Sequence, residues 1–241
     1  MLHLGKACKM KYLIYLVFLL SNLSCSPLIK YSQSNRQFEE EVSLLESFDL
    51  EEKASEKDLL FIGSSSIRLW DNIQVDMYPY SSVKRGYGGA HFYDLIHFSE
   101  RLVKNHSPKA ILIFIANDIT GSNDITNLVG DLSPKEVKKL FRYNYKVIRS
   151  IHKHIPIFLI ETTPTPKRWK VWNKILQSNK KLERFCKQEP NLYFISTRDK
   201  FIGADGLPIQ SLFLNDEIHL NVDGYKLWSS VIKSKLIEVG I

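Results

Sequence analysis

The sequence predicts an α/β fold: a three-layer α/β/α sandwich around a mainly parallel, flavodoxin-like central sheet. Two observations support this fold class. Four short runs are almost entirely apolar, as expected of strands buried on both faces of a parallel sheet. Helical patterns with short connections separate these runs, which is typical of a sheet covered on both sides. The 241 residues suffice for one such domain behind an N-terminal segment, and 44% hydrophobic with 24% charged residues is an ordinary globular composition.

The chain begins with the layout of a secretory signal peptide. Lysines precede an apolar run over residues 12–20 that is too short to span a bilayer, and small and polar residues follow up to Cys25. We therefore expect residues 1–25 to be a signal peptide, starting at Met1 or Met10, and the protein to be exported to a bacterial cell envelope. The lysines are Lys6, Lys9 and Lys11.

The end of this segment, Asn22-Leu23-Ser24-Cys25, resembles a bacterial lipobox. The cysteine of a lipobox carries the lipid, so Cys25 is a candidate lipidation site whose lipid would tether the protein to a membrane. Ordinary cleavage, which leaves a periplasmic protein, and an uncleaved anchor are the alternatives.

Charge and cysteine content narrow the classes of partner. The net charge of +7 falls to +4 once the three signal lysines are removed, and no basic block dominates the rest, so we expect no nucleic-acid partner. Cys186 falls on the apolar side of a helical pattern, which predicts a core position and no disulfide framework. No Cys, His or carboxylate cluster has zinc-ligand spacing, so we predict neither a metal nor another cofactor.

Residues 26–57 are polar and acidic, with Phe38, Val42 and Leu45 at helical spacing. This pattern predicts a short amphipathic helix and a linker that pack on the main domain and carry no chemistry of their own. The main domain is expected over residues 58–241.

The elements of this domain follow from its apolar patterns. A capping box of Ser133 and Glu136, with Pro134 at the first helical position, predicts a helix that continues to Ile151. A second apolar stripe begins at Trp169 and ends at Phe185, and its aromatic positions are expected in the core. The predicted strands are residues 59–62, 110–115, 155–160 and 192–195, with a shorter one at Val83 near Arg85.

Polar residues follow the predicted strands at the edge where parallel sheets bind ligands. Gly63-Ser64-Ser65-Ser66 ends the first strand, while Asp216 and His219 precede the last helical pattern. A hydroxyl, an imidazole and a carboxylate are the parts of a nucleophilic acyl-transfer site, in which His takes the Ser proton and Asp orients the His. Ile67 breaks any Gly-x-Ser-x-Gly elbow around Ser65, which argues against the α/β-hydrolase arrangement. The sequence therefore predicts a serine hydrolase of another fold.

Four blocks in order, around Ser65, Gly89, Asn117 and His219, resemble the SGNH, or GDSL-like, hydrolase family from about residue 58 to the C-terminus. The resemblance implies Ser65 as nucleophile, with Ser64 and Ser66 as alternative hydroxyls, and His219 as general base and then general acid, oriented by Asp216. It also implies an oxyanion hole formed by Ser65, the backbone N–H of Gly89 and the side-chain amide of Asn117.

Two positions depart from the family pattern. Ser64 stands where the family has Asp, which resembles a Gly-Ser-Ser-Ser subgroup, and Ile115 replaces a Gly. Asp118 is expected to brace its loop rather than to react.

We expect a carboxylic ester hydrolase that removes small acyl groups, most simply acetyl, from a carbohydrate or a similar polar substrate. The absence of a long apolar lid in the sequence supports a small substrate, and so does the resemblance to acetylhydrolase-like and sugar-ester-cleaving members. The alternatives are a lysophospholipase or thioesterase for longer acyl chains, and a catalytically idle binding domain. Candidate substrate-contacting residues, each with core or surface as its alternative, are Arg68, Trp70, Tyr87, Arg168 and Trp169.

Overall fold

The computed structural model describes residues 27–32, 36–51, 55–122 and 129–241. The predicted signal peptide over residues 1–25, with Cys25, lies outside these ranges. Within them, no helix combines the length and the apolar character needed to cross a bilayer.

The described residues form a sheet of five parallel strands in the order β2-β1-β3-β4-β5, so the predicted flavodoxin-like fold class is confirmed. In the register of the sheet, Gly63 at the end of β1 lies between Gly86 of β2 and Phe114 of β3. The direction of winding reverses between β1 and β3, which is where such sheets bind ligands. The strands are β1 Leu59–Gly63, β2 Ser82–Gly86, β3 Ala110–Phe114, β4 Ile157–Ile160 and β5 Leu192–Ile195.

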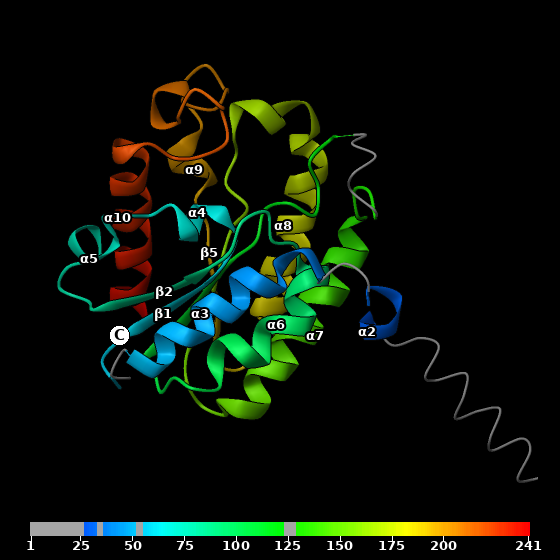
Figure 1. Ribbon diagram of the computed structural model, residues 1–241. Coiled ribbons are helices and arrows are strands. Elements are labelled where there is room, and N and C mark those ends of the chain that lie inside the picture. The colour runs from blue at the N-terminus through cyan, green and yellow to red at the C-terminus, as the bar shows by residue number, and fades with distance from the viewer. Residues whose placement is uncertain (1–26, 33–35, 52–54, 123–128) are drawn as a thin grey trace, which may run out of the picture.

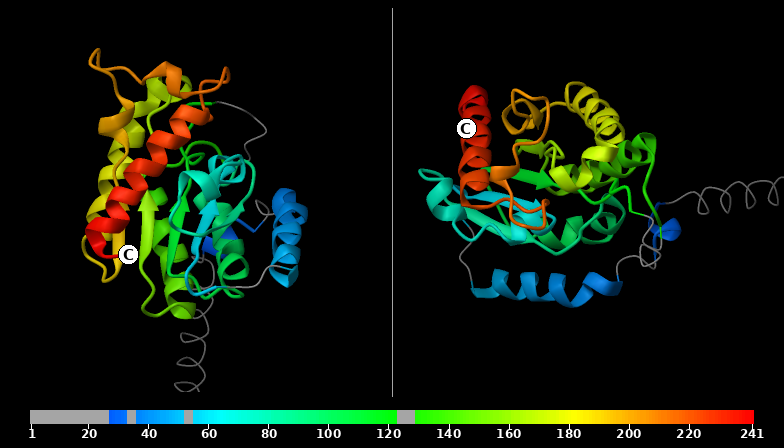
Figure 2. Two further views of the ribbon diagram at one scale, coloured as in Figure 1. Left: turned by 90° about the vertical axis from the view of Figure 1, so that its left-hand side faces the viewer. Right: turned by 90° about the horizontal axis from the view of Figure 1, so that it is seen from above.

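Helices cover both faces of this sheet (Figures 1 and 2). Alternate strand residues point to opposite faces, so each face has its own apolar cluster. One cluster lies under α6 (Phe92–Val103), α7 (Pro134–Ile151) and α8 (Trp172–Cys186). The other lies under α10 (Val222–Val239), with the short helices α4 (Ser65–Arg68), α5 (Ile73–Asp76) and α9 (Arg198–Phe201).

The predicted start of α7 is confirmed in detail. The hydroxyl of Ser133 accepts the N–H of Glu136 over 3.3 Å, and the carboxylate of Glu136 accepts the N–H of Ser133 over 3.0 Å. The second predicted helix differs at its start, because Trp169 belongs to a separate 3-10 helix, η2 (Pro166–Val171), and α8 begins only at Trp172. Cys186 is buried at the end of α8, as predicted.

The N-terminal segment contains α2 (Pro27–Lys30), a 3-10 helix η1 (Arg36–Phe38) and α3 (Glu39–Glu51). The predicted amphipathic helix is confirmed, since Phe38, Val42 and Leu45 are all buried. Figure 2 shows α3 on the outer side of α6, beyond the two helical layers of the sandwich. The remaining short element is η3 (Gln210–Leu212), in the loop before α10.

Candidate active site

Ser65 is the first residue of α4 and follows the carboxyl end of β1. The turn between them depends on Gly63, whose φ of +136° is unfavourable for other residues. A Cβ atom at Gly63 would also lie 1.9 Å from the carbonyl oxygen of Phe114. The N–H of Ser64 donates to that same carbonyl over 2.9 Å. The close approach of β1 and β3 therefore sets Ser65 at the switch point of the sheet.

The structure brings Ser65, His219 and Asp216 together in one chain of hydrogen bonds. The Nε2 atom of His219 lies 2.9 Å from the hydroxyl of Ser65, and its Nδ1 atom lies 2.5 Å from Oδ2 of Asp216. Ser65 comes from the turn after β1 and the other two from the loop before α10, which meet at the same end of the sheet (Figure 1). This is the arrangement of a nucleophile, a base and an orienting carboxylate.

The carboxylate of Asp216 is held by its own loop. Its Oδ1 atom accepts the backbone N–H groups of Ile218 over 2.9 Å and His219 over 3.0 Å. Desolvation acts to raise the pKa of Asp216, but the hydrogen bonds from the His219 ring and from these two N–H groups outweigh it and lower the pKa to about 2. Asp216 is therefore ionised throughout the neutral range and can fix the tautomer of the imidazole.

The two alternative serines occupy different surroundings. Ser64 and Ser66 are both buried, with 1% and 8% of their surface exposed. The carbonyl of Ser66 accepts the hydroxyl of Tyr225 over 2.9 Å. Among Ser64, Ser65 and Ser66, Ser65 has its hydroxyl within hydrogen-bond distance of His219.

The three predicted oxyanion-hole residues follow the carboxyl ends of three neighbouring strands, β1, β2 and β3. Ser65 is at the N-terminus of α4, where backbone N–H groups have no partner within the helix. Gly89 is exposed and has a φ of +71°, in the left-handed region that glycine tolerates. The side-chain Nδ2 of Asn117, after β3, donates to the carbonyl of Ala90 over 3.0 Å. An amide nitrogen carries two hydrogens, so a second donor remains for a ligand.

Arg168 has a role that the sequence did not reveal. Its Nη2 atom donates to Oδ1 of Asn117 over 2.6 Å, and its Nη1 atom donates to the carbonyl of Ala116 over 2.7 Å. Burial lowers the pKa of Arg168 to about 10, against the opposing influence of Asp131 and Asp118, so it remains a cation at neutral pH. The guanidinium of Arg168 is buried against the Asn117 loop, and Arg168 also lines the small cavity next to the candidate triad, so its predicted contact with substrate stays a prediction.

The predicted position at the substrate rim is wrong for two residues, Trp70 and Tyr87. Trp70 and Tyr87 are both 0% exposed. Trp70 stacks on Tyr225 and packs against Phe61 in the core under α10, and Tyr87 packs against Phe38 on the opposite side of the sheet. A large aromatic ring near a strand end can lie either in the core or at the substrate rim, and here the packing of both rings places them in the core.

The last two predicted rim residues remain near the surface. Trp169 is half-buried and stacks on Trp172, with ring centroids 5.9 Å apart. Arg68 is exposed, and its Nε atom lies 3.5 Å from a carboxylate oxygen of Glu41. A contact of either residue with substrate stays a prediction.

Asp118 braces the loop of Asn117. It is buried, and its Oδ1 atom accepts the N–H of Phe92 at the start of α6 over 3.0 Å. Burial raises the pKa of Asp118 to about 7, although His91, the Phe92 hydrogen bond and Arg168 act in the other direction. Its carboxyl group therefore titrates close to neutrality.

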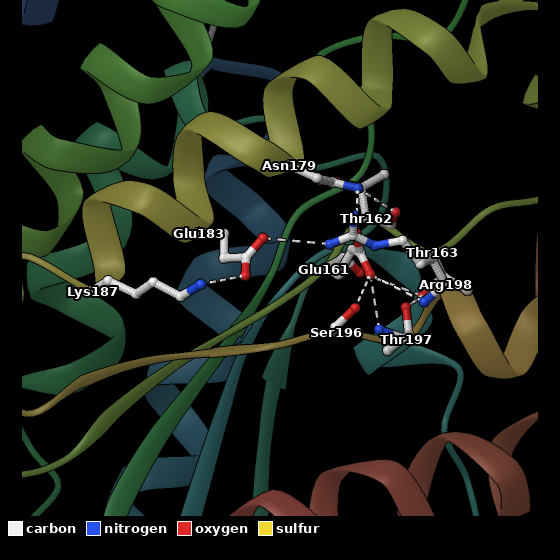
Figure 3. A network of polar contacts seen from close by, with 9 residues as sticks. All are labelled: Glu161, Thr162, Thr163, Asn179, Glu183, Lys187, Ser196, Thr197 and Arg198. Carbon is white, nitrogen blue, oxygen red and sulfur yellow. Dashed lines mark hydrogen bonds and ion pairs between the residues drawn. The ribbon is translucent and has the colours of Figure 1, made fainter.

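Glu161 anchors the next strand end, at the start of the segment that leads to Arg168 (Figure 3). It is 0% exposed, and its Oε2 atom accepts the N–H groups of Thr197 over 2.8 Å and Arg198 over 3.0 Å. Its Oε1 atom lies 2.8 Å from Nε of Arg198 and accepts Nδ2 of Asn179 over 3.2 Å. These contacts tie the carboxyl ends of β4 and β5 to α8.

A cavity of about 20 Å³ lies next to the candidate triad. Its lining includes the chain neighbours of three site residues, namely Ser66, Ala116 and Ile218. A cavity of about 10–15 Å³ holds one water molecule, so this space suits a group about the size of a methyl. Within the described ranges, no three His, Cys, Asp or Glu side chains gather as a candidate metal site.

Comparison with solved structures places this architecture among known folds. A protein from Streptococcus pneumonia described as a platelet activating factor matches with a TM-score of 0.70 and 19% identity, over 92% of this chain and 99% of its own. A GDSL-like lipase from Bacteroides thetaiotaomicron matches with a TM-score of 0.65 and 18% identity, over 82% of this chain and 98% of its own. The chain has the GDSL-like fold.

An acetylxylan esterase from Geobacillus stearothermophilus shares this GDSL-like fold, with a TM-score of 0.60 and 18% identity over 78% of this chain and 96% of its own. A scan of protein-family models and a search of curated proteins each gave no match.

Proposed function

We propose that this protein is a serine carboxylic ester hydrolase of the SGNH, or GDSL-like, type that removes a small acyl group, acetyl, from a carbohydrate or a similar polar substrate. The observation that carries the proposal is the hydrogen-bonded chain from Ser65 through His219 to Asp216. The GDSL-like fold of the chain, shared with a lipase and an acetylxylan esterase, supports the same reaction class.

The geometry supports a two-step mechanism. Oγ of Ser65 attacks the ester carbonyl carbon while Nε2 of His219 takes the hydroxyl proton, and Asp216 stabilises the imidazolium that forms. The carbonyl oxygen becomes an oxyanion, which the N–H groups of Ser65 and Gly89 and the amide of Asn117 would stabilise. His219 then gives its proton to the leaving alcohol oxygen, and the acyl group stays on Ser65.

A water molecule completes the cycle. His219 removes a proton from the water, whose oxygen attacks the acyl carbon of the Ser65 ester. The second tetrahedral intermediate collapses, Ser65 takes the proton back from His219, and the carboxylic acid leaves. No group is oxidised or reduced in either step.

The size of the adjacent cavity supports a short acyl group. Its volume of about 20 Å³ suits the methyl group of an acetyl ester. Apolar side chains of Phe114, Phe213 and Leu220 line it, which suits a methyl group.

Hydrolysis of p-nitrophenyl acetate and p-nitrophenyl octanoate by the purified protein tests the proposal. We expect preference for acetate, loss of turnover in Ser65→Ala, and retained turnover in the control variants Ser64→Ala and Ser66→Ala. Preference for octanoate would instead indicate a lipid or thioester substrate. Activity that survives Ser65→Ala would exclude Ser65 as nucleophile, and inactivity of the folded wild type over many esters would indicate a binding domain.

A further inference from the structure

The N-terminal helix α3 contacts the loop of residues 87–89, here called the oxyanion loop, although the helix lies outside the α/β/α sandwich (Figure 2). Both carboxylate oxygens of Glu41 accept the backbone N–H of Gly88, over 3.0 Å and 3.1 Å. Gly88 directly precedes Gly89, the residue whose N–H faces the oxyanion in the proposed mechanism. No sequence pattern indicates this contact, which joins residues 47 positions apart.

A second contact fixes the same loop. The ring of Phe38 lies against Gly89, since a Cβ atom there would be 3.8 Å from Cε1 of Phe38. The same ring packs on Tyr87, with centroids 5.1 Å apart. Residues 87–89 are therefore held by the η1–α3 segment at three consecutive positions. Two adjacent glycines have wide conformational freedom, so a loop of this composition needs such outside contacts to keep one conformation.

Glu41 also reaches the helix of the nucleophile. Its carboxylate lies 3.5 Å from Nε of Arg68, and Arg68 is the last residue of α4, which begins at Ser65. One side chain thus contacts both the oxyanion loop and α4.

Ion pairs of other residues also anchor α3 to the domain. Asp49 and Arg85 form an ion pair at 2.7 Å in which both side chains are 3% exposed. Arg101 of α6 binds Glu46 at 2.6 Å and Glu39 at 2.7 Å. These anchors lie on other residues of the helix, so the effect of Glu41 on the loop can be separated from the docking of α3.

We infer that Glu41 is a positioning residue of the active site, which holds the Gly88 N–H so that the next N–H, that of Gly89, points at the oxyanion. The inference rests on the proposed hydrolase function. This role of Glu41 makes α3 part of the active site and not only a linker.

The test compares Glu41→Ala, Glu41→Gln and the control Glu46→Ala in the full protein with p-nitrophenyl acetate. Loss of an entire oxyanion donor costs roughly 10²–10³ in kcat, so we expect Glu41→Ala to lower kcat by at least about tenfold with KM within about twofold. Glu41→Gln keeps one acceptor oxygen for the Gly88 N–H and should retain most of the wild-type kcat. Glu46→Ala should lower Tm and leave kcat unchanged.

A boronic acid provides a second readout, because its adduct with Ser65 places a tetrahedral oxygen in the oxyanion hole. The inhibition constant should rise in Glu41→Ala in parallel with the fall in kcat. Wild-type kcat in Glu41→Ala, or an equal loss of kcat in Glu46→Ala, would overturn the inference while leaving the hydrolase function intact. Absence of Ser65-dependent turnover in the wild type would overturn both.

Discussion

The guanidinium of Arg168 donates to Oδ1 of Asn117 over 2.6 Å. Because the guanidinium has only hydrogen-bond donors, the oxygen of the Asn117 amide must face Arg168. The NH₂ group of the amide therefore points away from Arg168. That NH₂ group is the proposed oxyanion donor, and the adjacent positive charge strengthens it as a donor. Arg168 is therefore a positioning residue in the proposed mechanism, acting through Asn117.

The first prediction concerns this pair. Arg168→Met should lower kcat about 10- to 100-fold. This loss should not exceed the roughly 10²–10³-fold loss expected for removal of an oxyanion donor, because Arg168 acts through Asn117. In an Asn117→Ala background, Arg168→Met should change kcat by less than about twofold, because residues that act as a unit are not additive.

Steady-state kinetics of the four proteins, with circular dichroism to verify folding, measures the coupling. Arg168→Lys is the matched control: it keeps the charge without the two-pronged donor geometry and should fall between wild type and Arg168→Met. Full additivity of the two substitutions would show that Arg168 acts independently of Asn117.

Asp216→Asn should lower kcat by up to about 10⁴-fold while leaving Tm little changed at pH 7, because an amide can hold the imidazole in the wrong tautomer. The pKa of Asp216 is lowered to about 2, so the carboxylate is ionised at every pH above about 4. Steady-state kinetics at pH 7, with thermal scans to verify folding, measures this loss. Wild-type kcat in Asp216→Asn would contradict the orienting role of Asp216.

Asp118 should make the stability of the protein depend on pH. Its pKa is raised from 3.8 to about 7 by burial, so its favourable contribution is fully present below pH 3.8 and is lost as the pH rises through about 7. Asp118→Asn should therefore unfold at a higher Tm than wild type at pH 8.5, and this gain should shrink at pH 5. Thermal scans of both proteins test this, with exposed Asp223→Asn as a control that should show no such trend.

Glu161→Ala should be strongly destabilising, because it leaves Arg198 and Asn179 without their buried partner. Breaking a buried ion pair in this way costs about 3–5 kcal/mol of the free energy of unfolding. Glu183→Ala removes a partly exposed partner of the same Arg198 and should cost no more than about 1 kcal/mol. Figure 3 shows both carboxylates beside Arg198. Urea unfolding measures the loss of stability in each variant, and equal losses would refute a special role for Glu161.

The sheet could be predicted because it depends on local patterns: apolar runs mark buried strands, and the carboxyl ends of parallel strands share one edge, where Ser65 and Asn117 follow β1 and β3. His219 lies in the loop before α10 and follows none of these strands, so its place beside Ser65 was predicted from the resemblance of its sequence block to the SGNH family. The roles of Arg168 and Glu41 could not be predicted in this way. Each depends on the direction of one long side chain, which is set by the packing of η2 or α3 against distant segments.

The hydrogen bond between Ser65 and His219 joins residues 154 positions apart, and the one between Tyr225 of α10 and the carbonyl of Ser66 joins residues 159 positions apart. Contacts of such long sequence separation cannot form until both segments exist. On the ribosome, Ser65 is translated long before His219, so a nascent chain that lacks His219 could not carry out the proposed mechanism. The proposed activity would therefore appear only after the last helix has emerged and docked.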